Sequence, residues 1–112
     1  MKAAYWQRGE SLDYRNNTGK KIEAGTVLVM GKRIAIAGAD IPAGEMGAVH
    51  VSGVFEFEKA DTTEITAGTE VYYCDDGITA AEKAGEDSNV PAGYAAANAE
   101  ANSTKVLVKI NA

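Results

Sequence analysis

The segment GADIPAGEMGAVHVSGVFEFEK, residues 38–59, decides the fold class. Its Pro42 has no N–H to donate to a sheet, so a loop is expected there. From residue 48 to residue 59, small or apolar side chains alternate with polar ones, which is the period of a strand with one buried face. Gly53 interrupts the alternation and predicts a bend or bulge between two strands. The segment is therefore typical of a small β module.

The same pattern continues along the chain. Runs of strand length, separated by glycine or by an Asp-Gly turn, predict strands at 25–31, 33–37, 49–51, 54–57, 68–74, 78–79 and 106–110. We interpret 59–67 and 90–93 as loops, and 80–84 as a possible helical turn. The alanine-rich stretch 94–101 has helical propensity but no polar face, so no helix is predicted there. The predicted fold is all-β, a small antiparallel β-barrel or sandwich of hairpins with at most one or two short helical turns.

The chain of 112 residues suits a single domain, 1–112. Residues 1–17 are expected to form an N-terminal arm that ends in a first short strand, since Gly9 interrupts any helical stripe. One Trp and two Phe are a thin aromatic supply. The core is therefore expected to be shallow, and oligomerisation would help to stabilise it.

A faint internal similarity links the two halves. AGTVLV at 24–29 matches AGTEVY at 67–72, and later parts of the segments 24–53 and 67–110 also resemble each other at a different spacing. Two explanations stay open. An old β unit is duplicated, or two sets of hairpins look alike because the same turn preferences shaped both.

Composition excludes several classes of partner. The formal net charge is −5, and no cluster of Lys or Arg exceeds a pair, so nucleic acid is not expected to bind. There is no apolar run near 18 residues, so we expect no membrane partner. The N-terminal sequence has no apolar segment of the signal-peptide kind. The lone Cys74 fits a reducing compartment, and synthesis in the cytoplasm is expected.

The residues that could carry chemistry do not form a recognisable set. No phosphate-loop motif is present, and one His with one Cys makes a metal site within the chain improbable. His50 is expected on a solvent or interface face and Cys74 as a packed thiol. Glu56 and Glu58 share one strand face, about 7 Å apart by the rise of a strand, and a solvated face is favoured over a glycosidase pair. We expect no enzyme activity, no cofactor and no metal.

The arm is the one segment whose composition suggests a contact. Tyr5 and Trp6 lie near a free terminus, with Arg8 close by. Aromatic and Arg side chains are enriched at the centres of interfaces. The alternative is that the two rings fold back over the protein's own core. Together with Phe55 and Phe57, these three residues are the candidates for contacts with a capsid or another subunit.

The order of turns and strands resembles the family of small phage and prophage proteins known as DUF2190, over nearly the whole chain. The matching motifs are Tyr14-x-Asn16-x-Thr18-Gly19, Ile22 before the strand that starts at Gly25, Ala39-Asp40-Ile41-x-x-Gly44-Glu45-x-Gly47, Gly53-Val54-Phe55 with Lys59, and more loosely Gly68–Tyr73, Gly93-Tyr94-Ala95 and Val106–Asn111. Members are sometimes labelled as RecA-type recombinases, and the missing phosphate loop argues against carrying that label over.

The resemblance implies a structural role. It suggests a non-enzymatic decoration protein, a homotrimer that binds the major capsid protein on the exterior of a phage head and stabilises it. The virion surface would then be its location, after synthesis in the cytoplasm of the bacterial host. The alternative, from another class, is a carbohydrate- or receptor-binding β module displayed on the particle. An enzyme would require Cys74, His50 and carboxylates to converge in space.

Overall fold

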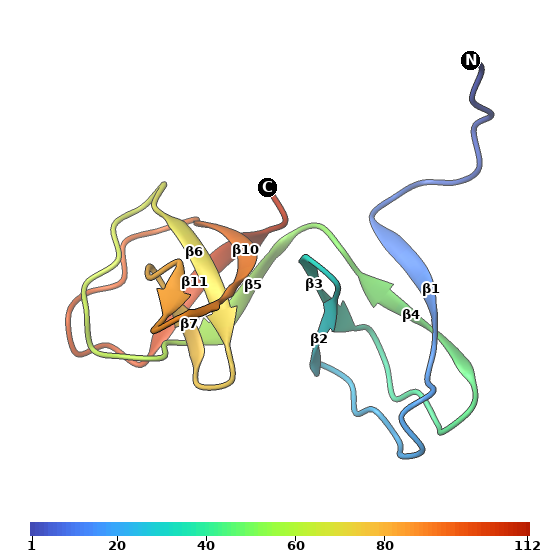
Figure 1. Cartoon of the computed structure of the whole chain (residues 1–112), viewed down its shortest axis with the longest axis horizontal. Coiled ribbons are helices and arrows are strands. Elements are labelled where there is room, and N and C mark those ends of the chain that lie inside the picture. The colour runs from blue at the N-terminus through green and yellow to red at the C-terminus, as the bar shows by residue number, and fades with distance from the viewer.

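The computed structural model describes the whole chain, residues 1–112, and contains strands but no helix (Figure 1). The strands are β1 (Ser11–Arg15), β2 (Val27–Met30), β3 (Arg33–Ala37), β4 (Met46–His50), β5 (Val54–Glu58), β6 (Glu70–Cys74), β7 (Gly77–Thr79), β8 (Lys83–Ala84), β9 (Asp87–Ser88), β10 (Val90–Ala95) and β11 (Lys105–Ile110). They form a first sheet in the order β1-β4-β3-β2, a second in the order β5-β11-β10-β6-β7, and a separate β8-β9 hairpin.

The first sheet is built from the N-terminal half. The β2-β3 hairpin pairs Met30 with Arg33, and Gly31 takes a φ of 65° in the turn between them. Such a backbone conformation suits Gly because it has no Cβ. A small core lies on one face of this sheet, and its buried members are Ile22, Ala35, Ala37, Ile41 and Val49.

The second sheet carries the larger core. Along β11 every second residue is buried, as expected for a strand with one dry face. Twelve buried residues form this core, among them Phe57, Val71, Ile78 and Val108. The sheet curls until β7 meets the end of β5 through a parallel bridge between Lys59 and Ile78. It remains a curled sheet and not a closed barrel.

Strand β3 belongs to the first sheet and contributes to both cores. Ile34 and Ile36 pack in the large core, whereas Ala35 and Ala37, which point the other way, pack in the small one. Because side chains alternate along a strand, one strand can serve two layers. Figure 1 shows β2 and β3 between the second sheet and strands β1 and β4.

The two sheets share one plan. The order β1-β4-β3-β2 is repeated by β5-β11-β10-β6, and β7 is additional in the second sheet. The bridge between Ile22 and Ile41 has a counterpart between Ile65 and Ala99. In the same place within each half, a side-chain oxygen of Asp40 or Asn98 accepts a bond from a loop amide, Ala24 N–H at 2.8 Å or Ala67 N–H at 2.7 Å.

Most predicted strands are confirmed, and two local assignments are wrong. The stretch 90–93 is not a loop, because Val90–Ala95 forms β10 with a register shift between Pro91 and Gly93. The register shift lets β10 pair with a strand on each side, although Pro91 has no N–H to donate. The helical turn at 80–84 is also wrong, since β8 pairs with β9 there. The absence of a helix at 94–101 is confirmed.

Candidate interaction surfaces

The N-terminal arm, residues 1–10, is exposed along its whole length and contains no strand. Trp6 is 91% exposed and Tyr5 76%, the largest fractions of any aromatic side chains in the molecule. The structure therefore does not fold these rings over the protein's own core. Gln7 Nε2 donates to the carbonyl of Ser11 at 3.3 Å, close to the start of β1. Arg8 is exposed beside them.

The other two candidate contact residues lie in a different environment. Phe57 is 7% exposed and belongs to the large core, and Phe55 is half-buried against that core. The Phe55 ring lies 5.9 Å from the His50 ring, centroid to centroid, and His50 Nδ1 is 3.1 Å from Ser11 Oγ. The five candidates therefore divide into an exposed arm and a packed pair.

An apolar hollow of about 300 Å³ opens near the base of the arm. Its lining residues are Leu12, Met30, Arg33, Ile34, Val51 and Asn111. Leu12 at the start of β1, Met30 at the end of β2 and Val51 after β4 are half-buried and pack against the small core. The hollow therefore lies where the small core meets the first residues of β3 and the end of the second sheet, and Arg33 is the one charged residue in its lining.

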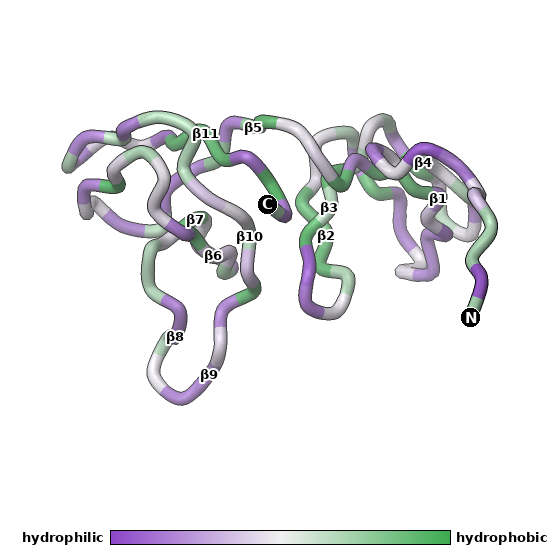
Figure 2. The backbone as a smooth tube through the Cα atoms, turned by 90° about the horizontal axis from the view of Figure 1, so that it is seen from above, coloured by the Kyte–Doolittle hydropathy of each residue, from purple (hydrophilic) through white to green (hydrophobic).

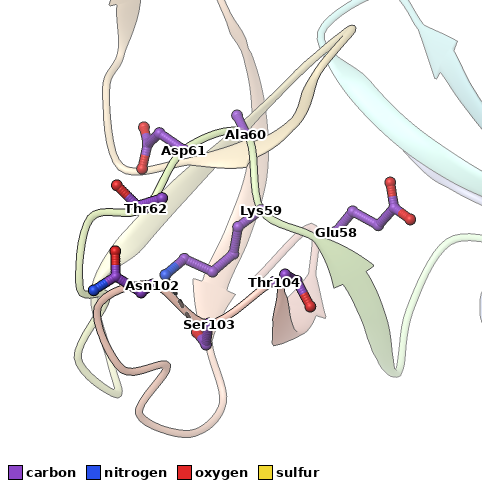
Figure 3. Close-up of a pocket in the computed structure, with 8 residues that line it drawn as sticks. All are labelled: Glu58, Lys59, Ala60, Asp61, Thr62, Asn102, Ser103 and Thr104. Atoms are coloured by element: carbon purple, nitrogen blue, oxygen red, sulfur yellow. Dashed lines mark hydrogen bonds between the residues drawn. The ribbon is translucent and has the colours of Figure 1, made fainter.

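The largest pocket, about 380 Å³, is polar and lies between the end of β5 and the start of β11 (Figure 3). Figure 3 shows Glu58 and Asp61 directed away from each other. Asp61 is already bonded, because its Oδ1 accepts from Thr63 N–H at 3.0 Å and its Oδ2 from the Thr79 hydroxyl at 3.4 Å. The pocket therefore does not present a pair of converging carboxylates for acid–base chemistry.

Lys59 is the buried charge beside this pocket, 8% exposed. Its Nζ donates to the Glu100 carbonyl at 3.0 Å and to Ser103 Oγ at 3.3 Å. Asn16 has the matching place in the first sheet, where its Nδ2 donates to the Ile41 carbonyl at 2.8 Å. Both side chains tie a turn to the end of an edge strand. Both residues belong to the motifs shared with the DUF2190 family, but the motifs alone do not reveal this role, which depends on contacts across the fold.

The two residues weighed as catalytic have separate partners. Cys74 Sγ donates to the Gly77 carbonyl at 3.4 Å within the β6-β7 hairpin, while His50 contacts Ser11 and Phe55. The pKa of Tyr73 is raised above 10.0. Burial is the largest cause, and the nearby charges of Asp75 and Cys74 add to it in that order. Partial burial and the charges of Glu82 and Glu70 raise the pKa of Tyr72 in the same direction. Both phenols therefore keep their protons at neutral pH.

Figure 2 shows the β8-β9 hairpin extending away from the rest of the molecule. Residues 81–88 are exposed throughout. The hairpin is held at its base by Asn89, whose backbone N–H donates to the Glu82 carbonyl and whose Nδ2 donates to the Ala81 carbonyl, both at 2.9 Å. Together with the arm, it is one of the two segments that project from the body.

The structure has neither a cluster of metal ligands nor a membrane-spanning helix. No group of three His, Cys, Asp or Glu side chains lies in an arrangement that could hold a metal ion. The chain also has no helix of the length and apolarity needed to cross a bilayer.

Comparison with known proteins places the chain in a family. No curated protein and no solved structure matches it significantly. A family described as phage cement protein matches residues 6–110, which is nearly the whole chain and includes both sheets. The match starts within the exposed arm, at Trp6. The chain belongs to the phage cement protein family, and it is a structural protein associated with the phage capsid.

Proposed function

We propose that the protein binds the outer surface of a phage capsid as an oligomer and stabilises the head without catalysing a reaction. The family match over residues 6–110 carries this proposal. The geometry supports it, because two of the three ionisable side chains that line the largest pocket tie loops together. Lys59 and Asp61 are both bonded within the protein.

The exposed arm supplies a contact suited to this role. Trp and Tyr each bury roughly 150–250 Å² when they are covered, and such residues dominate interface energetics. In the isolated chain Tyr5 and Trp6 leave that area in water. Binding to the major capsid protein or to another subunit would recover it. Arg8 adds a charged side chain that pairs well with carboxylates.

Exposed apolar side chains on the strands also favour oligomerisation. Val29, Met46, Val54 and Leu107 are 41–55% exposed on the strands, and the small core has only five buried members. A closed ring of subunits buries such apolar faces at each interface. On a capsid, many copies held at once combine weak contacts into strong attachment. We propose a homotrimer at the three-fold positions of the shell.

The experiment uses heads of the phage that encodes this chain, assembled without it. Purified protein is added, the heads are sedimented, and the bound protein is quantified along with the temperature at which the heads break open. We expect saturable binding with a copy number set by the lattice, and a higher breakage temperature. Trp6→Ala should weaken binding by at least about tenfold. Heads that neither bind the protein nor gain stability would refute the proposal.

A further inference from the structure

The two sheets differ at the seam between their edge strands. In the second sheet, β7 covers the seam between β5 and β6. Ile78 pairs with Tyr73 of β6, and its carbonyl accepts from Ala60 N–H at 2.8 Å on the β5 side. The Ile78 side chain is 0% exposed and completes the large core. A short strand with one apolar side chain therefore covers this seam.

The first sheet has no strand in this place. Its edges, β1 and β2, are each paired on one side alone, and a two-residue turn at 31–32 stands where the second half has β7, β8 and β9. Unpaired edge strands offer N–H and C=O groups to another chain. The first sheet therefore keeps an open seam, which we call the β1-β2 seam.

The side chains at the β1-β2 seam show the effect of this missing cover. Tyr14 and Leu28 face the small core and are half-buried, whereas Phe57 and Val71, which have the matching places in the second sheet, are 7% and 1% exposed. The apolar hollow of about 300 Å³ has Leu12 of β1 and Met30 of β2 in its lining, so both edge strands of the seam border it. An apolar face without a cover in the isolated chain marks a binding surface.

We propose that the β1-β2 seam accepts the N-terminal arm of a second copy of this chain, as an added strand with Trp6 in the hollow. This inference rests on the oligomer of the proposed function and names the contact that builds it. Strand addition to a sheet edge supplies main-chain hydrogen bonds, and a pocket for alternate side chains supplies specificity. The arm is extended and has no strand partner of its own.

Three properties of the arm fit the seam. Ten residues in extended form reach about 33 Å, which is enough to cross to a neighbouring copy. The two rings supply about 300–500 Å² of a contact that needs roughly 800 Å² from each partner. The arm carries Lys2 and Arg8 against Glu10, whereas the whole chain has a charge of −5. A basic arm is therefore attracted to the acidic body of another copy.

A second copy is favoured over the arm's own chain. Figure 1 shows the arm leaving the start of β1 and running away from both sheets. Glu10 is anchored, because its carbonyl accepts from Val51 N–H at 3.0 Å, and Gln7 bonds back to Ser11. These contacts direct the arm outward. An arm that leaves one copy and enters the next makes a head-to-tail contact, which closes into a ring when the rotation allows.

The first test uses Trp6, the only Trp in the chain. Fluorescence and light-scattering mass are followed together over a dilution series of the full chain. We expect blue-shifted emission at high concentration, and a red shift on dilution with the same midpoint as the loss of mass. Leu28→Asn should raise that midpoint by at least about tenfold. Val29→Asn, on the opposite face of the same strand and 49% exposed, is the matched control and should leave it unchanged.

A cross-linking test identifies the partner chain. In a Cys74→Ser background, a tagged chain with Trp6→Cys is mixed with an untagged chain carrying Leu12→Cys, and the mixture is oxidised. We expect a product of the summed size. In a second experiment Trp6→Cys and Leu12→Cys are placed in the same chain. An internal disulfide bond would form if the arm folded back onto its own chain, and that result would overturn the inference.

Removal of residues 1–9 covers the case in which Leu28→Asn fails to fold, because those residues are exposed and are bonded to the strands only through the Gln7 side chain at Ser11. We expect a monomer at concentrations where the full chain is oligomeric. Persistence of the oligomer without the arm, or a full chain that is monomeric at every concentration, would refute arm exchange. The proposal of capsid binding can fail independently of arm exchange. An oligomer that depends on the arm but does not bind heads would refute capsid binding and leave arm exchange standing.

Discussion

Asn111, near the C-terminus, is hydrogen-bonded to both backbone groups of Ile34 in β3. Its Nδ2 donates to the Ile34 carbonyl at 2.8 Å and its Oδ1 accepts from Ile34 N–H at 3.3 Å. The same Nδ2 donates to the Val51 carbonyl at 2.9 Å. One side chain at the end of the second sheet therefore joins it to the first. The φ of Asn111 is 56°, a conformation that Asn tolerates better than most residues.

The first prediction concerns this link. Asn111→Gly keeps the backbone conformation and removes the amide, so we expect the free energy of unfolding to fall by about 1–3 kcal/mol, because buried backbone groups lose their partners. Asn111→Ala should be worse, since it adds a cost for positive φ. Urea unfolding measures both. Asn17→Ala, at an exposed position, is the control and should change little; equal stability of Asn111→Gly and the natural chain would show that the link contributes nothing.

Local patterns in the sequence predict the strands well but say less about how they assemble. The alternation of polar and apolar residues at 106–110 is enough to place β11, because one face of that strand is buried. Pro91 is a failure of the same reasoning. It reads as a loop residue because it cannot donate to a neighbour, yet β10 lies between β11 and β6. The bulge that accommodates it depends on tertiary pairing.

The candidate surfaces were predictable to a similar degree. Composition singles out Tyr5 and Trp6, but whether they fold back depends on long-range packing. The sequence also offers Phe55 and Phe57 as contact residues, but it does not show how exposed they are. In the structure Phe57 is buried in the large core. Lys59, Asn16 and Asn111 lie in motifs that the sequence shows, but their roles come from contacts across the fold, which those motifs do not reveal. Duplication of 24–53 in 67–110 stays a prediction, and the shared strand order supports it.

The second prediction concerns Asn16, which is fully buried. Its Oδ1 accepts from Thr18 N–H at 3.0 Å, and its Nδ2 donates to the carbonyls of Lys20 at 2.6 Å and Ile41 at 2.8 Å. We expect Asn16→Ala to lower the free energy of unfolding by about 1–3 kcal/mol, because it removes the hydrogen bonds that this buried amide makes to the Lys20 and Ile41 carbonyls and to Thr18. Asn16→Asp should also destabilise, since a carboxylate cannot donate to those carbonyls. Thermal unfolding at neutral pH tests the pair, and full stability of Asn16→Asp would contradict the assigned geometry.

The third prediction uses the glycine at the β10 bulge. Gly93 has a φ of 128°, and a Cβ built on it would collide with the backbone carbonyl oxygen of Lys109 in β11. Gly93→Ala therefore combines backbone strain of about 1–3 kcal/mol with a clash that separates two strands. We expect loss of the folded state or a marked fall in Tm. Gly9→Ala, in the arm with nothing within 4 Å, is the control and should leave Tm unchanged.

The fourth prediction concerns pH. Since burial raises the pKa of Tyr73 above 10.0, and Tyr72 shifts in the same direction, the folded protein holds these protons more tightly than the unfolded chain. Their stabilising effect is complete below pH 10 and is lost as the pH rises through the folded-state pKa values. We expect a late phase in the absorbance titration of phenolate and stability that declines above pH 10. Tyr73→Phe should remove part of that phase, and an unaltered late phase would show that it arises from other tyrosines.

The last prediction concerns the projecting β8-β9 hairpin. Lys83–Ala84 pairs with Asp87–Ser88, and residues 81–88 are exposed, so the hairpin buries little apolar surface. The first sheet makes the corresponding connection with a two-residue turn. Replacing 83–88 by Asn-Gly keeps Glu82 and Asn89, whose backbone bond closes the base. We expect the free energy of unfolding to change by less than about 1 kcal/mol. A large loss would mean that the hairpin supports the fold, whereas preserved stability with weaker binding to heads would identify it as a capsid contact.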